Sequence, residues 1–236
     1  GWSKDSFKYL WNYGNKMLAS ALLDTAYNNI TPVFVGKYYS PADLGVYNRA
    51  RNYAQMPSQN VTGVIQNVTF PVLSKMLNDN EGLARNYRRM IRTTAFIVFP
   101  MMFMLSALAR PLILMMITAK WEPCIILLQL MCFSMMWYPI HAMNLNLLQV
   151  KGRTDLFLRL EIIKKILCLS ILVITLPQGL IIFCIGNIVA TILCLFINTY
   201  YTGKLINVVF LTQMKDLIPI LLLSSIMYLA IYYANL

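Results

Sequence analysis

The chain has 236 residues, of which 58% are hydrophobic and 12% are charged, and its formal net charge at pH 7 is +11. Soluble domains carry about 25% charged residues, whereas several windows here approach the roughly 20 apolar residues that cross a bilayer. This composition excludes a soluble globular domain and predicts an all-α, polytopic membrane helix bundle. We interpret the excess of Lys and Arg as the positive charge of cytoplasmic loops, so we expect membrane lipid and no nucleic acid as partners.

The first predicted span runs from about Phe7 to Val35, and residues 1–15 are interpreted as its cytoplasmic lead-in. Asp24 is the only carboxylate that we expect deep inside a span. Asn28 and Asn29 lie in the middle of the same span. A mid-span amide either faces a cavity or bonds to a neighbouring helix, and the sequence leaves both alternatives open.

One long helix is predicted next, from Pro41 to Ser74, with Ser40 or Asp43 as its N-cap and a kink at Pro57. At 100° per residue its polar side chains fall in one stripe, and Val and Ala dominate the opposite side. Inside a membrane such a stripe needs water or protein beside it. The stripe consists of Asn48, Asn52, Gln55, Gln59, Thr62, Gln66 and Thr69, bordered by Arg49, Asn60 and Asn67 on one side and by Arg51 on the other.

Five further spans bring the predicted total to about seven, which places the two ends of the chain on opposite sides of the membrane. If the N-terminus is cytoplasmic, fifteen Lys and Arg residues fall in inside segments and three in outside turns. Glu161, Lys164, Lys165 and Asp216 are assigned to cytoplasmic ends. The spans are Thr93–Leu108, Cys124–Gln149, Ile162–Leu176, Leu180–Tyr201 and Leu217–Ala234, with a short re-entrant or interfacial segment at Leu112–Ile117.

The sequence offers no catalytic or metal-binding constellation. The five cysteines occur singly in apolar runs, and no CxxC, GxSxG, Walker A or HExxH motif is present. We therefore predict no enzyme activity, no metal and no cofactor. His141 is the only histidine, and it is either a packed, hydrogen-bonded residue or, with Asp24, a group that couples transport to an ion.

The polar stripe instead predicts a transport path. Arginine guanidinium groups bind phosphate by forked hydrogen bonds, and amides suit sugar hydroxyls. The alternative is a polar face that packs against other helices and binds no substrate. The predicted substrate path comprises Arg49, Arg51, Asn52, Gln55, Gln59, Asn60, Gln66 and Asn67, together with Asn28 and Asn29.

Several long segments of the chain resemble one transporter family. They are GKYYSPADLGVYNRARNYAQMPSQNVTGVIQNVTFPVLSKM, YRRMIR, YPIHAMNLNLLQVKGRTDLFLRLEIIKK and FINTYYTGKLI. They are similar to Wzx-like polysaccharide transporters, the lipopolysaccharide-biosynthesis flippases of the MOP (MATE-like) superfamily. The resemblance implies a single membrane domain over residues 1–236, which would be one lobe, the C-terminal one, of a two-lobe chain.

The resemblance also implies the activity, location and partners of the longer protein. It would move an undecaprenyl-diphosphate-linked oligosaccharide repeat unit across the bacterial inner membrane, by alternating access of the two lobes. Expected partners are the lipid-linked oligosaccharide, the missing N-terminal lobe and polysaccharide-assembly proteins.

Three other functions remain as alternatives to the flippase. A small-molecule or multidrug exporter of the same superfamily would favour buried carboxylates, whereas this stripe offers Arg and amides. A membrane glycan polymerase or ligase would need large outside loops, whereas the outside turns here are short. The third alternative is a membrane subunit that transports nothing.

Overall fold

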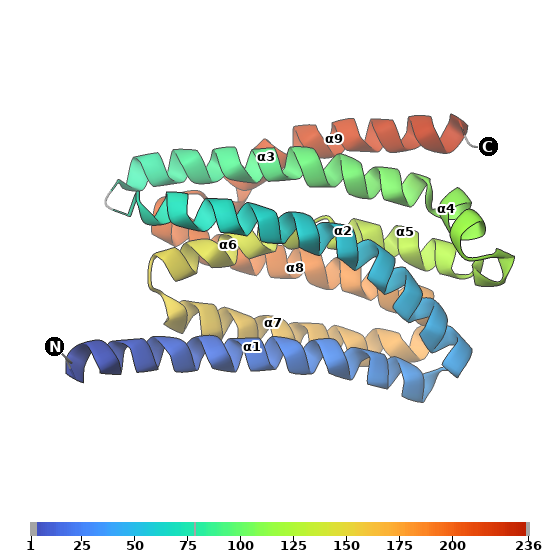
Figure 1. The fold of residues 1–236 in the computed structure, drawn as a ribbon, viewed down its shortest axis with the longest axis horizontal. Coiled ribbons are helices and arrows are strands. Elements are labelled where there is room, and N and C mark those ends of the chain that lie inside the picture. Colours follow the sequence, from blue (N-terminus) through green and yellow to red (C-terminus); the bar gives the residue numbers. More distant parts are fainter. Residues whose placement is uncertain (1–3, 78, 235–236) are drawn as a thin grey trace.

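The computed structural model describes residues 4–77 and 79–234, and within these ranges every regular element is helical (Figure 1). This confirms the prediction of an all-α helix bundle. The long helices are α1 (Lys4–Tyr38), α2 (Pro41–Ser74), α3 (Asn80–Ala107), α5 (Cys124–Met135), α6 (Tyr138–Val150), α7 (Thr154–Thr175), α8 (Leu180–Ile206) and α9 (Phe210–Ala234); α4 (Ala109–Met116) and two 3-10 turns, η1 (Ala119–Trp121) and η2 (Leu176–Gln178), are short.

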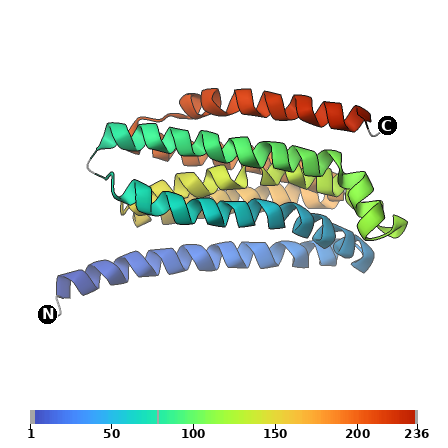
Figure 2. The ribbon, with the colours of Figure 1, turned by 45° about the horizontal axis from the view of Figure 1, so that its top comes forward.

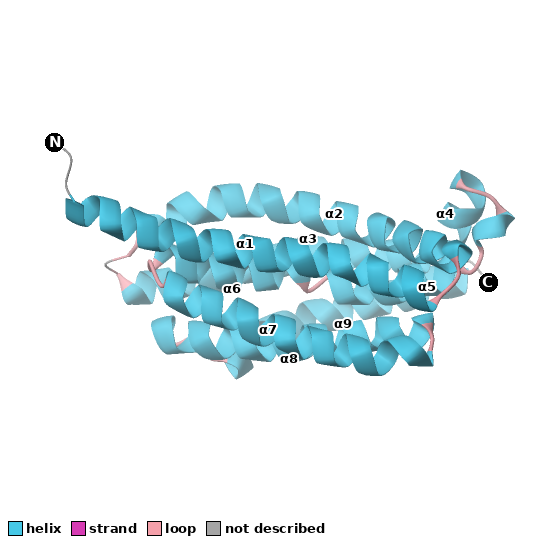
Figure 3. Ribbon diagram, turned by 90° about the horizontal axis from the view of Figure 1, so that it is seen from below, coloured by secondary structure: helices cyan, strands magenta, loops and turns pink. Residues whose placement is uncertain are grey.

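The described part of the chain passes along the bundle seven times when α5 and α6 are taken as one interrupted crossing. The N- and C-termini lie at opposite ends (Figure 1). In Figure 2, α1 and α9 form the two outer edges, with the other helices between them. In Figure 3, α1 lies beside α7, with which it packs. Helix α2 packs against α5, α6 and α3.

The fourth span, predicted as continuous, is interrupted between Met135 and Tyr138. Pro139 explains the break, because proline has no N–H to donate to the carbonyl four residues earlier, which is that of Met135. The Ser58 hydroxyl of α2 donates to this carbonyl instead, at 2.7 Å. A side chain of one helix thus satisfies a backbone group that proline leaves open in another.

The boundaries of the other helices follow the prediction in part. The N-cap of α2 is Ser40, whose hydroxyl accepts from the Asp43 N–H while the Asp43 carboxylate accepts from the Ser40 N–H. However, α3 begins at Asn80 and α9 at Phe210, well before the predicted starts at Thr93 and Leu217. The predictions placed these starts where the apolar run begins, whereas the helices extend beyond it as amphipathic turns.

Four of the seven crossings are long and apolar enough, among the described residues, to span a membrane by length and hydropathy alone: α3, α5–α6, α8 and α9. The other three, α1, α2 and α7, cross beside them but carry more polar residues. This division has a structural cause, because α1, α2 and α7 supply most of the polar lining of an internal cavity. The polar residues that line this cavity lower the hydropathy of these helices, because a membrane helix places such residues toward a cavity or a neighbouring helix.

Most of the Lys and Arg residues gather at one end of the bundle, which we call the basic end. It comprises the start of α1 and the α2–α3, α6–α7 and α8–α9 connections, seen at the left of Figure 1. Lys151 joins two of these connections, because its ammonium donates to Asn80 Oδ1 at 2.8 Å and to the Leu77 carbonyl at 3.4 Å. The interpretation of residues 1–15 as a lead-in stays a prediction; from Lys4 onward they belong to α1.

The outer helix α9 is tied to α3 by an ion pair. Arg88 donates to both carboxylate oxygens of Asp216, at 2.7 and 2.9 Å, and the Asp216 side chain is only 9% exposed. We expect Arg88→Ala to lower the free energy of unfolding by about 1–3 kcal/mol, because it leaves a mostly buried carboxylate without its partner. Thermal unfolding of the full-length protein in detergent would measure this. The exposed Arg89, changed to Ala, is the control, and equal stability of the two variants would contradict the prediction.

Candidate functional site

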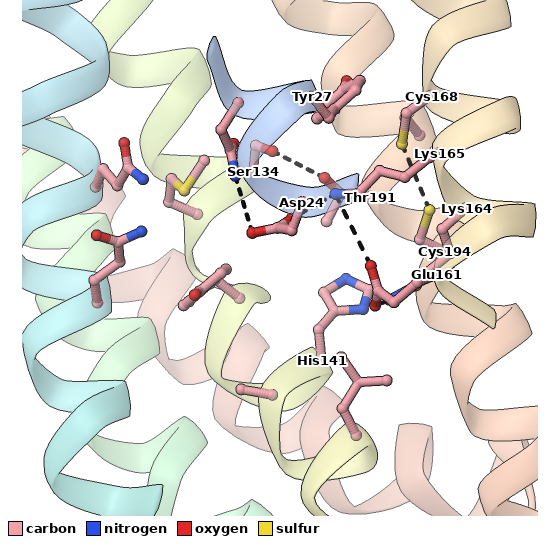
Figure 4. A pocket seen from close by; sticks show the side chains of 18 of the residues that line it. Asp24, Tyr27, Ser134, His141, Glu161, Lys164, Lys165, Cys168, Thr191 and Cys194 are labelled. Atoms are coloured by element: carbon pink, nitrogen blue, oxygen red, sulfur yellow. Dashed lines mark hydrogen bonds and ion pairs between the residues drawn. The ribbon is translucent and has the colours of Figure 1, made fainter. Parts of the chain in front are cut away.

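A cavity of about 460 Å³ lies among α1, α2, α5, α6, α7 and α8 (Figure 4). Most of its lining is apolar or uncharged, but five charged side chains from three helices face it. They are Asp24 of α1, Arg51 of α2, and Glu161, Lys164 and Lys165 of α7. Three cations thus face two carboxylates, which leaves the cavity with an excess of positive charge at neutral pH.

Lys165 connects α7 to α1 across the cavity. Its ammonium lies 2.5 Å from Asp24 Oδ1, 4.0 Å from Glu161 Oε2 and 4.7 Å from the centroid of the Tyr27 ring. Figure 4 shows Asp24, Glu161 and Lys165 converging from the two helices. The aromatic face and both carboxylates stabilise the ammonium, so that Lys165 needs little water around it.

The neighbouring lysine, Lys164, forms an ion pair with Glu161 inside the bundle. The two side chains are 10% and 8% exposed. Glu161, Lys164 and Lys165 thus lie within the bundle and line the cavity, and their assignment to a cytoplasmic end stays a prediction. Glu161 lies seven residues inside α7, which at 1.5 Å per residue is about 10 Å from the helix start.

Arg51 extends the charged network to α2. Its guanidinium donates to the Asn28 carbonyl at 3.2 Å and to Asn28 Oδ1 at 3.1 Å, while Asn28 Nδ2 donates to Asp24 at 3.0 Å. With Lys165, these contacts form a continuous polar connection from α2 through α1 to α7. The sequence left two alternatives for Asn28, a position facing a cavity or a bond to a neighbouring helix. Both are found, because Asn28 lines the cavity and accepts from Arg51 of α2.

The predicted path residues divide between the cavity and its surroundings. Arg51, Gln55, Gln59, Gln66 and Asn28 line the cavity, as do Asp24 and His141. Asn67 lines an adjoining cavity with Gln66. The remaining predicted residues do not line either cavity: Arg49 packs its guanidinium over Trp121 at 5.1 Å, Asn29 donates to its own helix at the Thr25 carbonyl, and Asn52 and Asn60 are exposed.

His141 lies at the cavity wall and bonds to α8. Its Nδ1 is 3.0 Å from Asn198 Nδ2, and Asn198 is fully buried. This contact is what the packed, hydrogen-bonded alternative requires, while the position of the ring at the cavity agrees with the ion-coupling alternative. The participation of His141 and Asp24 in ion coupling stays a prediction.

Comparison with known proteins places residues 1–126, just over half of the chain, within the family described as "Polysaccharide biosynthesis protein". The chain belongs to this family. Its resemblance to Wzx-like transporters is thereby confirmed at the level of the family. No solved structure matches the chain.

Curated relatives are about a quarter to a third identical to the chain over the segments that align. It is 26% identical to an uncharacterized membrane protein in the cps region of Klebsiella pneumoniae, over 75% of this chain and 36% of the relative. It is 25% identical to the lipopolysaccharide biosynthesis protein WzxC of Escherichia coli, over 69% and 33%. A segment covering 38% of the chain is 32% identical to 18% of the succinoglycan biosynthesis transport protein ExoT of Rhizobium meliloti. The chain spans about a third of the length of the first two relatives.

Sequence reasoning missed many of the cavity residues, and the missed residues that carry charge, Glu161, Lys164 and Lys165, are all on α7. The segment Glu161-Ile-Ile-Lys-Lys carried a usable signal, because residues three and four apart lie on one helix face and can pair. Gly152 breaks the chain just before α7, so a helix start at Thr154 could have been predicted from it. Glu161, Lys164 and Lys165 would then have been placed inside the helix. Cys168 and Cys194, whose sulfurs are 3.8 Å apart between α7 and α8, also line the cavity.

Proposed function

We propose that this chain is part of a flippase that moves undecaprenyl-diphosphate-linked oligosaccharide repeat units across the bacterial inner membrane. The observation that carries the proposal is a cavity with an excess of positive charge inside a membrane helix bundle of the polysaccharide biosynthesis family. Two relatives support the direction of the proposal by their names, a lipopolysaccharide biosynthesis protein and a succinoglycan transport protein.

The cavity suits an amphiphile that carries both phosphate and sugar. Arg51 offers a planar guanidinium fork, which is the geometry that binds phosphate oxygens in pairs. Lys164 and Lys165 add two cations, and each is balanced by a carboxylate until an anionic group competes for it. Gln55, Gln59 and Asn28 supply amides for sugar hydroxyls. Four predicted path residues line neither cavity: Arg49, Asn29, Asn52 and Asn60. We still propose that they contact the substrate in the assembled full-length protein.

We propose that the basic end faces the cytoplasm, which places the N-terminus of this segment there, because positively charged connections are retained on that side. The chain spans about a third of its relatives, so the opposite wall of the path would come from the rest of a longer polypeptide, the N-terminal lobe. Further partners would be the proteins that polymerise and export the polysaccharide.

Deletion of the full-length gene from its host tests the function. We expect the surface polysaccharide to disappear and its lipid-linked repeat unit to accumulate on the cytoplasmic leaflet, and the full-length gene to restore both. Electrophoresis of surface glycan and extraction of precursor lipid would measure this. Increased drug sensitivity with normal glycan would contradict the proposal in favour of an exporter, and single repeat units at the surface would favour a polymerase.

A further inference from the structure

A second cavity, of about 420 Å³, adjoins the charged one toward the basic end. It is formed by α2 and α6, and none of the described residues that line it is charged. Three residues line both cavities, Gln66, Asn146 and Gln149, so the two spaces adjoin at these side chains. The complete lining is Gln66, Asn67, Phe70 and Pro71 of α2 and Asn146 and Gln149 of α6.

One amide of this lining is buried without a full set of partners. Asn146 is 5% exposed, and its Oδ1 accepts from Gln66 Nε2 at 3.3 Å, but its Nδ2 has no hydrogen-bond partner among the described residues. Leaving such a donor unpaired costs about 1–3 kcal/mol. Because Asn146 lines the cavity, a hydroxyl group bound there would supply the missing acceptor after a small rotation of the amide.

The chemistry of the lining selects one class of ligand. Four carboxamides provide donors and acceptors in equal measure, which matches hydroxyl groups, since these also donate and accept. An anion would be drawn to the cations of the neighbouring cavity, and a cation would need carboxylates, of which this lining has none. Phe70 and Pro71 add apolar surface of the kind that accompanies polar groups in small-molecule sites and can cover the C–H face of a sugar ring.

We propose that Gln66, Asn67, Asn146 and Gln149, with Phe70, form a subsite for the neutral saccharide part of the substrate, separate from the charged cavity that binds its phosphate. This inference rests on the proposed function and adds Asn146, Gln149 and Phe70 to the residues that contact substrate. Gln66 lies 15 residues after Arg51 on α2, about 22 Å along the helix. The saccharide would therefore extend from the phosphate toward the basic end, along α2 and α6.

Binding of two separate probes to the full-length protein in detergent tests the subsite. One probe is the oligosaccharide released by mild acid from the host's surface polysaccharide, which has neither lipid nor phosphate. The other is geranyl diphosphate, which has no sugar. We expect Asn146→Leu and Gln149→Ala each to weaken oligosaccharide binding about fivefold to tenfold, the loss of one or two neutral hydrogen bonds, and to leave geranyl diphosphate binding unchanged.

Three further observations decide the outcome. Gln178→Ala removes an exposed carboxamide at the opposite end of the bundle and should change neither affinity. An unaltered melting temperature of Gln149→Ala shows that its effect is not one of folding. Wild-type protein that does not bind the oligosaccharide, or variants that bind it normally, would overturn the subsite. Failure of the proposed function would differ, because geranyl diphosphate would then not bind to the wild-type protein at all.

Discussion

Replacement of Arg51 by Ala in the full-length protein is expected to abolish most export of surface polysaccharide while the protein remains in the membrane. Arg51 is the only arginine that faces the charged cavity among the described residues, and its guanidinium holds Asn28 of α1 through two hydrogen bonds. Hydrogen bonds to charged groups contribute about 1.5–3 kcal/mol, which corresponds to a loss of about tenfold to a hundredfold in affinity for a phosphate group. Quantitative electrophoresis of surface glycan, with an immunoblot for protein abundance, measures the effect.

Two other arginines make the Arg51 experiment specific. Arg110 is not among the residues that line the cavity, and it forms an exposed pair with Glu122 at 3.8 Å, so the Arg110→Ala strain should export normally. Arg49 packs over Trp121, and Arg49→Ala should therefore cause a smaller loss than Arg51→Ala. Normal glycan in the Arg51→Ala strain, or an equal loss in all three strains, would show that the cavity charge does not bind the substrate.

The largest effect on stability is expected from Glu161→Ala. Glu161 pairs with Lys164 in the bundle interior and also lies 4.0 Å from Lys165, so its removal leaves one buried ammonium without a counter-charge. Breaking a buried pair on one side costs about 3–5 kcal/mol, and we expect the lower end, because the cavity admits some water. Thermal unfolding of the purified full-length protein, followed by tryptophan fluorescence, measures the loss.

A double variant separates the unpaired charge from simple loss of packing. Glu161→Leu combined with Lys164→Met removes both charges and keeps the volume, so it should recover most of the stability lost by Glu161→Ala. Asp155→Ala serves as the comparison, because it removes the partner of Arg153 in a pair whose side chains are both more than 40% exposed, and it should have little effect. A double variant as unstable as the single one would refute the role of the ion pair.

The polar stripe of α2 shows how far the sequence could be interpreted. The helix and its polar side followed from periodicity, and the two N-cap candidates, Ser40 and Asp43, followed from residue type. Arg51, Gln55, Gln59 and Gln66 do face the cavity. Periodicity could not show how wide the cavity is. Two residues apart on a helix means about 200° of rotation, so Arg49 and Arg51 cannot both face the same cavity, and only contact with other helices decides which one does.

The charges of α7 could not be placed for a different reason. Hydropathy marks where a segment becomes apolar, and this led to a predicted start at Ile162, immediately after Glu161. The helix starts at Thr154. Its charged residues, Glu161, Lys164 and Lys165, line the cavity, and α1 packs beside them. The partner in α1, Asp24, is 141 residues away in sequence, and such long-range pairing leaves no periodic trace.

The hydroxyl of Ser58 that caps the open Met135 carbonyl makes two positions on different helices interdependent. If residue 139 were not proline, its own N–H could donate to that carbonyl, and the carbonyl would not need a hydroxyl donor from residue 58. With proline at 139, an alanine at 58 would leave the Met135 carbonyl oxygen without a hydrogen-bond donor inside the bundle. Among homologues, these two sites should consequently show correlated substitution, with proline at the second accompanied by serine or threonine at the first.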